Sequence, residues 1–120
     1  MSRTDEIRVE RPTADSAVVV LTGQHDLSNS LELEQLLDSL IADTKLVVAD
    51  ASEAEFVDST ILNTLVRSHR QAAAVGCTFR VQLGTTAIVH RAFELTGVLE
   101  VLDWAATREE ALRQPSEGRP

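Results

Sequence analysis

The chain has 120 residues, 43% of them hydrophobic, which suits one domain with its own core. Its formal net charge is −8 and its 11 lysines and arginines are scattered, which argues against nucleic acid and anionic membranes as partners, because both need clustered cations. A single cysteine excludes an internal disulfide, and the charged start of the chain has no apolar signal segment, so we expect a cytoplasmic protein.

The first third of the chain predicts two strands followed by a helix. Residues 7–10 alternate apolar and polar side chains, as in a short edge strand, and residues 12–15 read as a turn. Residues 17–22 are rich in β-branched side chains and predict a buried strand that ends at a glycine. A helix is expected to begin at Asn29, which has capping-box spacing to Glu32. Its apolar stripe consists of Leu33, Leu36, Leu37, Leu40 and Ile41.

The middle third predicts a strand, a loop and a second helix. Residues 46–49 form a short apolar run typical of a buried strand, and residues 51–57 are expected to form a loop. The second helix is predicted over residues 59–75, because Gly76 is a natural residue to follow a helix end. One side of this helix carries Leu62, Leu65, Val66, His69 and Ala73.

The last third predicts a strand and two further helices. Residues 79–83 alternate apolar side chains with Arg80 and Gln82, which indicates a half-exposed strand. A third helix, capped by Thr85 or Thr86, is expected to end at Leu95. A short apolar run then precedes a final helix, predicted over about residues 106–113.

Strands that alternate with helices predict an α/β fold with right-handed crossovers. We expect one domain over residues 7–113, with a mixed, mostly parallel sheet of four to five strands and about four helices. Residues 1–6 and 114–120 are expected to form tails, the second of them disordered. Because function collects at the carboxyl ends of parallel strands, the polar loops at residues 23–26, 51–59 and 84–86 are candidate sites.

The middle loop ends in the polar triplet Asp58-Ser59-Thr60, directly before the second helix. Helix N-termini favour negative charge, so a serine there can carry a phosphate without strain. Asp58 can cap the helix while Ser59, at its first position, points outward. The alternative is that both residues serve only as caps, for which Asp and Ser are common choices. We interpret the triplet as a phosphorylatable binding switch.

A histidine next to an aspartate, His25-Asp26, raises the alternative of an enzyme in which Ser59 is the nucleophile and His25 its base. No Gly-x-Ser-x-Gly elbow or oxyanion loop accompanies this pair, and Asp26 more simply braces the loop before the first helix. We therefore predict no catalytic residue. The three histidines lack metal-ligand spacing and Cys77 has no nearby partner thiol, so neither a metal site nor a cofactor is predicted.

Three segments of the chain resemble those of STAS domains, the family of anti-sigma factor antagonists. Residues 21–26, Leu-Thr-Gly-Gln-His-Asp, are similar to the family's Leu-x-Gly-x-Leu-Asp segment. Residues 57–62, Val-Asp-Ser-Thr-Ile-Leu, resemble its Asp-Ser-Ser-Gly-Leu phosphorylation loop, and residues 93–98 resemble its Phe-x-Leu-Thr-Gly-Leu segment. The segments occur in the family's order and spacing, and the resemblance covers roughly residues 5–112.

The resemblance implies a regulator of transcription in bacterial stress or sporulation signalling. The unphosphorylated form would bind an anti-sigma factor, a serine kinase of the histidine-kinase-like ATPase fold, and so free a sigma factor. The kinase would phosphorylate Ser59, which weakens the complex, and a serine phosphatase would restore the binding form. The alternative within the same fold is a non-phosphorylated STAS-like assembly module of a transporter or stress-signalling complex, against which the Asp58-Ser59 pair argues.

The expected docking surface combines the Ser59 loop, the start of the second helix and the loop at residues 24–28. Ile61 stands where the family has glycine, and Thr60 replaces its second serine. Helical spacing assigns Leu62 to the core, so Ile61 is expected near the rim as an exposed apolar anchor. The predicted partner-binding residues are Gln24, His25, Asp26, Asp58, Ser59, Thr60, Ile61 and Thr64.

Overall fold

Strands and helices alternate along residues 6–84 and 87–113, which the computed structural model describes. Thr85 and Thr86, predicted as helix caps, lie outside the described residues, as do residues 1–5 and 114–120 of the predicted tails. The strands are β1 (Glu6–Thr13), β2 (Ser16–His25), β3 (Leu46–Asp50), β4 (Ala54–Val57), β5 (Thr78–Gln82) and β6 (Trp104–Ala105). The helices are α1 (Leu27–Asp43), α2 (Ser59–Val75), α3 (Ala87–Leu95) and α4 (Arg108–Ala111), with a 3-10 turn, η1, at Val98–Glu100.

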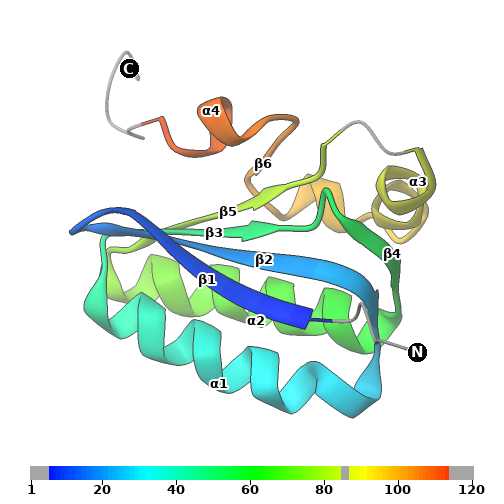
Figure 1. Ribbon diagram of the computed structural model, residues 1–120, viewed down its shortest axis with the longest axis horizontal. Coiled ribbons are helices and arrows are strands. Elements are labelled where there is room, and N and C mark those ends of the chain that lie inside the picture. The colour runs from blue at the N-terminus through cyan, green and yellow to red at the C-terminus, as the bar shows by residue number, and fades with distance from the viewer. Residues whose placement is uncertain (1–5, 85–86, 114–120) are drawn as a thin grey trace.

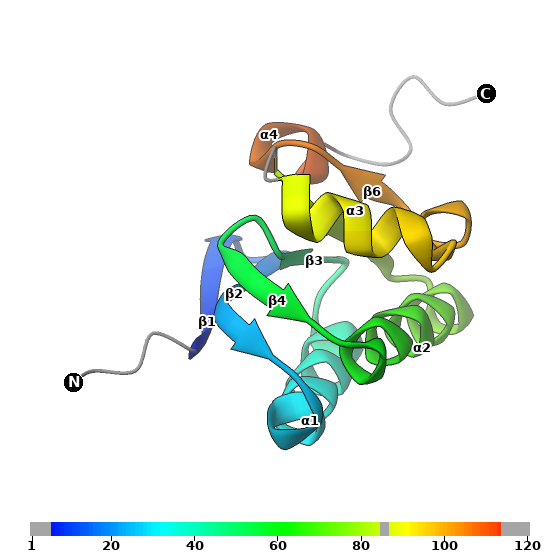
Figure 2. The ribbon, with the colours of Figure 1, turned by 90° about the vertical axis from the view of Figure 1, so that its right-hand side faces the viewer.

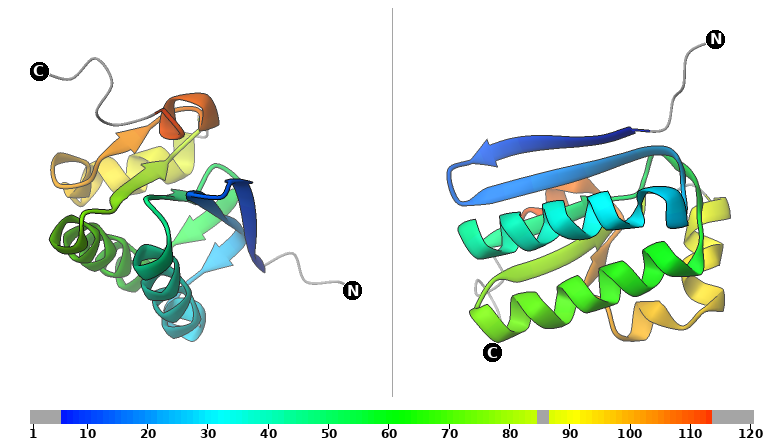
Figure 3. Two further views of the ribbon diagram at one scale, coloured as in Figure 1. Left: turned by 90° about the vertical axis from the view of Figure 1, so that its left-hand side faces the viewer. Right: turned by 90° about the horizontal axis from the view of Figure 1, so that it is seen from below.

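The strands form one sheet in the order β1-β2-β3-β5-β6, and β4 pairs with the far end of β2. β1 runs antiparallel to β2, whereas every other pair is parallel, so the predicted mixed, mostly parallel sheet is confirmed. α1 and α2 lie side by side on one face, and α4 covers part of the other (Figures 1 and 3). α3 lies beyond β4 at one end of the molecule (Figure 2).

β2 is the centre of the core because its apolar residues are buried on both faces of the sheet. Ala17, Val19 and Leu21 belong to the main cluster with the apolar sides of α1 and α2. Val18 and Val20 belong to a smaller cluster that includes apolar residues of β3, β6 and α4. Burial on both faces explains why this strand reads as a continuous apolar run rather than as an alternating pattern.

The helix α1 follows its predicted apolar pattern, whereas in α2 Leu62 and Leu65 are buried as predicted but Ala73 is exposed. Four of the five stripe residues of α1 are buried, and Leu36 packs against them partly exposed. α1 begins before Asn29, however, because Asp26 is its N-cap and accepts a hydrogen bond from the amide of Ser28. Asn29 is then the third helical residue, and its side chain accepts from the amide of Asp26 at 3.0 Å. α2 has the predicted bounds and ends at Gly76, whose φ of 79° is the left-handed conformation that glycine favours.

Four strand predictions are wrong in detail. β1 continues to Thr13 and so includes residues 12 and 13 of the predicted turn. β2 continues through Gly23 to His25, because β4 pairs with this extension. β4 itself lies in the segment predicted to be a loop. β5 is not half-exposed, because Arg80 and Gln82 are both buried on the face that α4 covers.

Candidate functional site

The N-termini of α1 and α2 lie at the same edge of the sheet, where the parallel strands end (Figures 1 and 2). β4 pairs with the end of β2, which places Gln24 opposite Phe56 and His25 opposite Val57. The amide of Asp58 then donates to the carbonyl oxygen of His25 at 3.2 Å. This pairing confirms that the loops after β2 and β3 meet at one rim.

Ser59 is exposed and is the first residue of the 17-residue helix α2. Asp58 precedes it as the N-cap with extended backbone angles, and one carboxylate oxygen accepts from the amide of Ile61 at 3.1 Å. The cap therefore acts within one turn and leaves the Ser59 side chain on the surface. No acidic residue follows the Asp58 cap in the first turn of α2, so a negative group at Ser59 would lie at the positive end of the helix dipole beside that single carboxylate.

His25 lies in the interior, which corrects its assignment to the docking surface. Its side chain is fully buried. Nε2 donates to the carbonyl oxygen of Thr22 at 2.9 Å, and Nδ1 accepts from the side-chain amide of Asn29 at 2.8 Å. This histidine braces the end of β2 against the start of α1. Since both ring nitrogens have partners, neither has a lone pair available to activate Ser59, which weakens the catalytic alternative.

Ile61 and Thr64 are also buried, so the expectation of an exposed isoleucine anchor is wrong. Ile61 is 0% exposed and packs in the main core together with Leu62. The reason is that α2 packs against both the sheet and α1, so its buried side includes small and polar residues, Thr64, Ser68 and Ala72, that the apolar pattern does not mark. The hydroxyl of Thr64 donates to the carbonyl oxygen of Thr60 at 3.0 Å.

The remaining predicted residues lie at the rim. Gln24 is exposed, and Asp26, Asp58 and Thr60 are partly exposed beside the exposed Ser59. Gln24 and Asp26 both have interaction partners. The prediction therefore places five of the eight residues where a partner can reach them.

The sequence prediction missed two exposed apolar side chains near this rim. Leu27, the first residue of α1, is 72% exposed, and Phe56 of β4 is 49% exposed. Leu27 falls outside the apolar stripe of its helix, and that mismatch is the signal that identifies it as a surface residue. Phe56 gives no such signal, because its exposure depends on the strand β4, which was predicted to be a loop.

A groove of about 400 Å³ opens beside the start of α1, on the side of β1. Glu6, Asp26 and Glu32 contribute three carboxylates to its walls. The other lining residues are Ile7, Gln24, Ser28 and Asn29. The rim is therefore acidic on the α1 side, which suits a basic partner surface.

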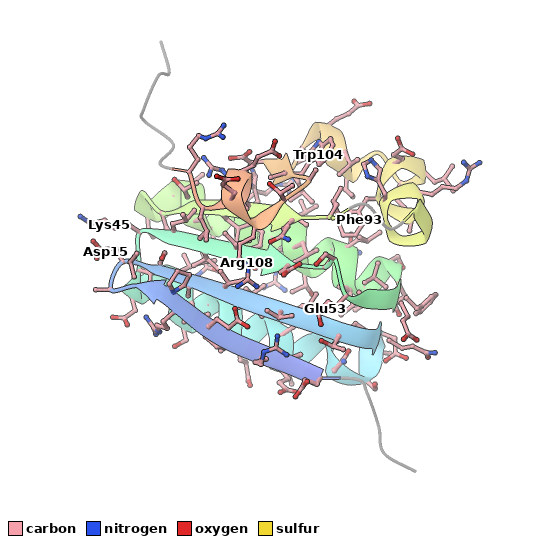
Figure 4. The ribbon with its side chains drawn as sticks, turned by 45° about the horizontal axis from the view of Figure 1, so that its top comes forward. Asp15, Lys45, Glu53, Phe93, Trp104 and Arg108 are labelled. Atoms are coloured by element: carbon pink, nitrogen blue, oxygen red, sulfur yellow. The ribbon has the colours of Figure 1, made fainter. Side chains whose placement is uncertain are left out.

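An ion-pair network on the opposite face holds the loop that leads into β4. Arg108 of α4 lies over the sheet (Figure 4) and donates to the carboxylates of Glu10 and Asp50. Asp50 is buried at the end of β3, where it also accepts from the amide and hydroxyl of Ser52. The hydrogen bond from Arg108 lowers the pKa of Glu10 and, in turn, raises the pKa of the guanidinium. A side chain at Gly84 would meet the Cβ atom of Ser52 at 2.6 Å, so the third polar loop packs against the second.

The described part of the chain contains neither a metal-binding cluster nor a membrane-spanning helix. No group of three or more histidine, cysteine or acidic side chains there is arranged to hold a metal ion. None of the described helices has the length and apolar character needed to cross a bilayer.

A family model described as "Mlab, STAS domain" matches residues 9–103. The chain belongs to the STAS domain family. None of the curated proteins compared with this STAS domain matches it in sequence.

Solved structures share its fold. An anti-sigma factor antagonist from Mycobacterium paratuberculosis is 26% identical with a TM-score of 0.78, over 93% of this chain and 96% of that one. The anti-sigma factor antagonist SpoIIAA in its unphosphorylated form is 19% identical with a TM-score of 0.74, over 89% and 93%. The Bacillus SpoIIAA in its phosphorylated form is also 19% identical, with a TM-score of 0.66 over 89% and 96%.

The fold also occurs within larger proteins. The murine anion transporter Slc26a9 is 15% identical with a TM-score of 0.68, over 85% of this chain. The match covers only 18% of the transporter, so the STAS fold is a small part of that molecule.

Proposed function

We propose that this STAS domain is an anti-sigma factor antagonist controlled by phosphorylation of Ser59. The unphosphorylated protein binds an anti-sigma factor with serine kinase activity and thereby releases a sigma factor. Transfer of phosphate to Ser59 weakens the complex, and a serine phosphatase restores the binding form. Gln24, Asp26, Asp58, Ser59 and Thr60 contact the partner, whereas His25, Ile61 and Thr64 support them from the interior.

The position of Ser59 carries this proposal. It is exposed at the first position of α2, next to an N-cap aspartate, and shares its rim with the start of α1. A hydroxyl at that position is accessible to a kinase. The likeness to anti-sigma factor antagonists gives the same interpretation independent support.

A phosphate at this position changes the surface without disturbing the core. It adds about −1.5 to −2 charges at pH 7, and a helix N-terminus favours negative charge. SpoIIAA has been solved in both phosphorylation states, and both resemble this chain. These two structures support a switch that acts through partner contacts and not through unfolding.

Phosphate transfer tests the assignment directly. The protein is incubated with radiolabelled ATP and, in turn, each purified histidine-kinase-fold ATPase encoded in the same genome. We expect one kinase to label the wild-type protein and Thr60→Val, but not Ser59→Ala. Label that persists on Ser59→Ala would refute the assignment, and absence of any labelling would refute the proposed function.

Ser59→Asp separates binding from folding. Because a carboxylate is favourable at the start of a helix, we expect the free energy of unfolding to stay within about 1 kcal/mol of wild type. Affinity for the kinase is expected to fall, and Ser59→Asn serves as the uncharged control. A variant that loses binding only because it unfolds would contradict a surface switch.

A second candidate is an assembly module that is not phosphorylated, as the fold shared with the transporter Slc26a9 suggests. Such a module would bind its partner equally well with serine or aspartate at position 59. The same pair of variants therefore distinguishes the two functions.

A further inference from the structure

Two leucines on the outer side of α1 expose most of their surface to solvent. Leu27 is 72% exposed and Leu31 is 62% exposed. They are four residues apart, so they lie one above the other on the same side of the helix. Single exposed leucines are common on protein surfaces, but a pair aligned along one helix forms a continuous apolar ridge.

This ridge, Leu27 and Leu31, lies level with Ser59. α1 and α2 run side by side in the same direction from the rim (Figure 3). An ion pair between Glu34 of α1 and Arg67 of α2 shows which residues of the two helices lie level. One turn toward the rim from this pair are Leu31 and Asn63, and two turns toward it are Leu27 and Ser59, since a turn is about 3.6 residues.

The other flank of the ridge is acidic. Glu32 follows Leu31 directly and lines the groove together with Glu6 and Asp26. α1 contains no lysine or arginine in its 17 residues. Across this surface there is thus a carboxylate flank, an apolar ridge and then the α2 side, where the hydroxyl of Ser59 lies next to the Asp58 cap and above the Glu34–Arg67 ion pair.

We propose that Leu27 and Leu31 form the apolar anchor by which this protein docks on its anti-sigma factor, an inference that rests on the proposed function. Charge complementarity specifies the partner surface. It is an apolar groove that receives the two leucines, with basic side chains on the wall facing Glu32 and no basic side chain on the wall facing Ser59, where the carboxylate of Asp58 already accepts from the amide of Ile61. A helix laid in a groove through residues four apart is a recurring mode of recognition.

This arrangement explains how one phosphate releases the partner. Phosphate on Ser59 falls on the wall that has no basic side chain, beside the desolvated leucines, and not on the basic wall. A dianion cannot be buried there without a counter-charge, so the groove must open. The acidic flank remains unchanged and specifies which partner is chosen.

The test compares leucines on two surfaces. The double variant Leu27→Gln/Leu31→Gln is titrated calorimetrically with the purified kinase that labels Ser59, and Leu95→Gln is the control because Leu95 is 74% exposed on α3. We expect the double variant to bind about tenfold more weakly or worse, as for interface hot spots, and the control to bind like wild type. Glu32→Lys is expected to weaken binding and Glu109→Lys, on α4, to leave it unchanged.

The outcomes separate this proposal from the proposed function. Unchanged affinity of the double variant, with Ser59 still labelled, overturns the ridge alone. Failure of every kinase to label wild-type protein overturns both. Sedimentation of the wild-type protein as a dimer that the double variant dissociates would show that the ridge covers a second copy of the chain, and would also overturn the proposal. Circular dichroism melting of each variant checks that a loss of binding is not a loss of fold.

Discussion

At the rim that carries Ser59, the N-cap side chains of α1 and α2 accept from amides within a few residues, whereas under α4 two arginines bond across the length of the chain. Asp58 caps α2 through the amide of Ile61, three residues away. On the opposite face, Arg108 pairs with Glu10 across 98 positions, and Arg80 reaches carbonyl oxygens near the end of the described chain. Local caps hold the rim without covering it, so its surface stays available for modification and binding.

On the α4 face, hydrogen bonds between residues far apart in the sequence hold the structure. Arg80 is buried, and Nη1 donates to the carbonyl oxygen of Ala111 at 2.8 Å and to that of Arg113 at 2.5 Å. Nε donates to the carboxylate of Asp103 at 3.0 Å. One side chain therefore satisfies several acceptors around the end of α4 and fixes this short helix on the sheet. Few changes are expected to be tolerated there, while many should be tolerated at the rim.

The largest expected effect comes from Ile61→Asp, because this position lies next to the exposed rim but is itself fully buried. An unpaired carboxylate in the core should cost more than about 4 kcal/mol, against a typical total stability of about 5–15 kcal/mol. Urea unfolding should show a largely unfolded variant, whereas Asn63→Asp, exposed on the same helix, should unfold like wild type. A folded Ile61→Asp protein would show that position 61 tolerates a charge. Ile61 would then belong to the accessible rim despite its burial in this structure.

Arg80→Met is expected to have the second largest effect. Methionine fills much of the same space but leaves carbonyl oxygens near the end of α4 without a donor, which should cost about 2–4 kcal/mol. Arg70→Met, at an exposed position of α2, is the matched control and should cost less than about 0.5 kcal/mol. Equal unfolding midpoints in urea for the two variants would remove the distinction between the faces.

Asp58→Ala tests the local cap and should be milder. Loss of the N-cap hydrogen bond typically costs about 1 kcal/mol, and the core beneath it is unchanged. Glu55→Ala, exposed on the neighbouring strand, is the control. If Asp58→Ala costs as much as Arg80→Met, the rim is not held by a local cap alone.

The smallest effect concerns the pH dependence of the Glu10–Arg108 pair. Hydrogen bonding from Arg108 lowers the pKa of Glu10 from its ordinary value of 4.5 in the folded protein. Its contribution to stability is therefore fully present above 4.5 and is lost as the pH falls through the lowered folded pKa. Urea titrations of wild type and Glu10→Gln should differ slightly at neutral pH and converge as the pH is lowered below 4.5. A difference that grows on acidification would contradict the pairing.

The same contrast explains which features could be predicted from the sequence. α2 was predicted with its observed bounds, because its cap, apolar period and terminal Gly76 all lie within the helix or beside it. The rim was predicted from the order of strands and helices. Ile61 was misplaced, because the buried side of α2 is turned from the predicted stripe: Ser68 and Ala72 are buried, whereas Ala73 of the predicted stripe is exposed.

The features that were missed depend on distant partners. β4 has four residues and becomes a strand only by pairing with the end of β2, about 30 positions earlier. Arg80 and Gln82 read as surface residues because arginine and glutamine usually are, and only the packing of α4 buries them. Such contacts leave no local pattern in the sequence.

The central claim is that phosphate on Ser59 changes partner binding and leaves the fold intact. The most direct measurement is the calorimetric affinity of the anti-sigma factor kinase for the unphosphorylated and the fully phosphorylated protein, with the melting temperature of each form recorded in parallel. The account predicts that phosphorylation weakens binding by about tenfold or more, while the melting temperatures agree within a few degrees. Equal affinities for the two forms, or a phosphorylated protein that no longer folds, would contradict it.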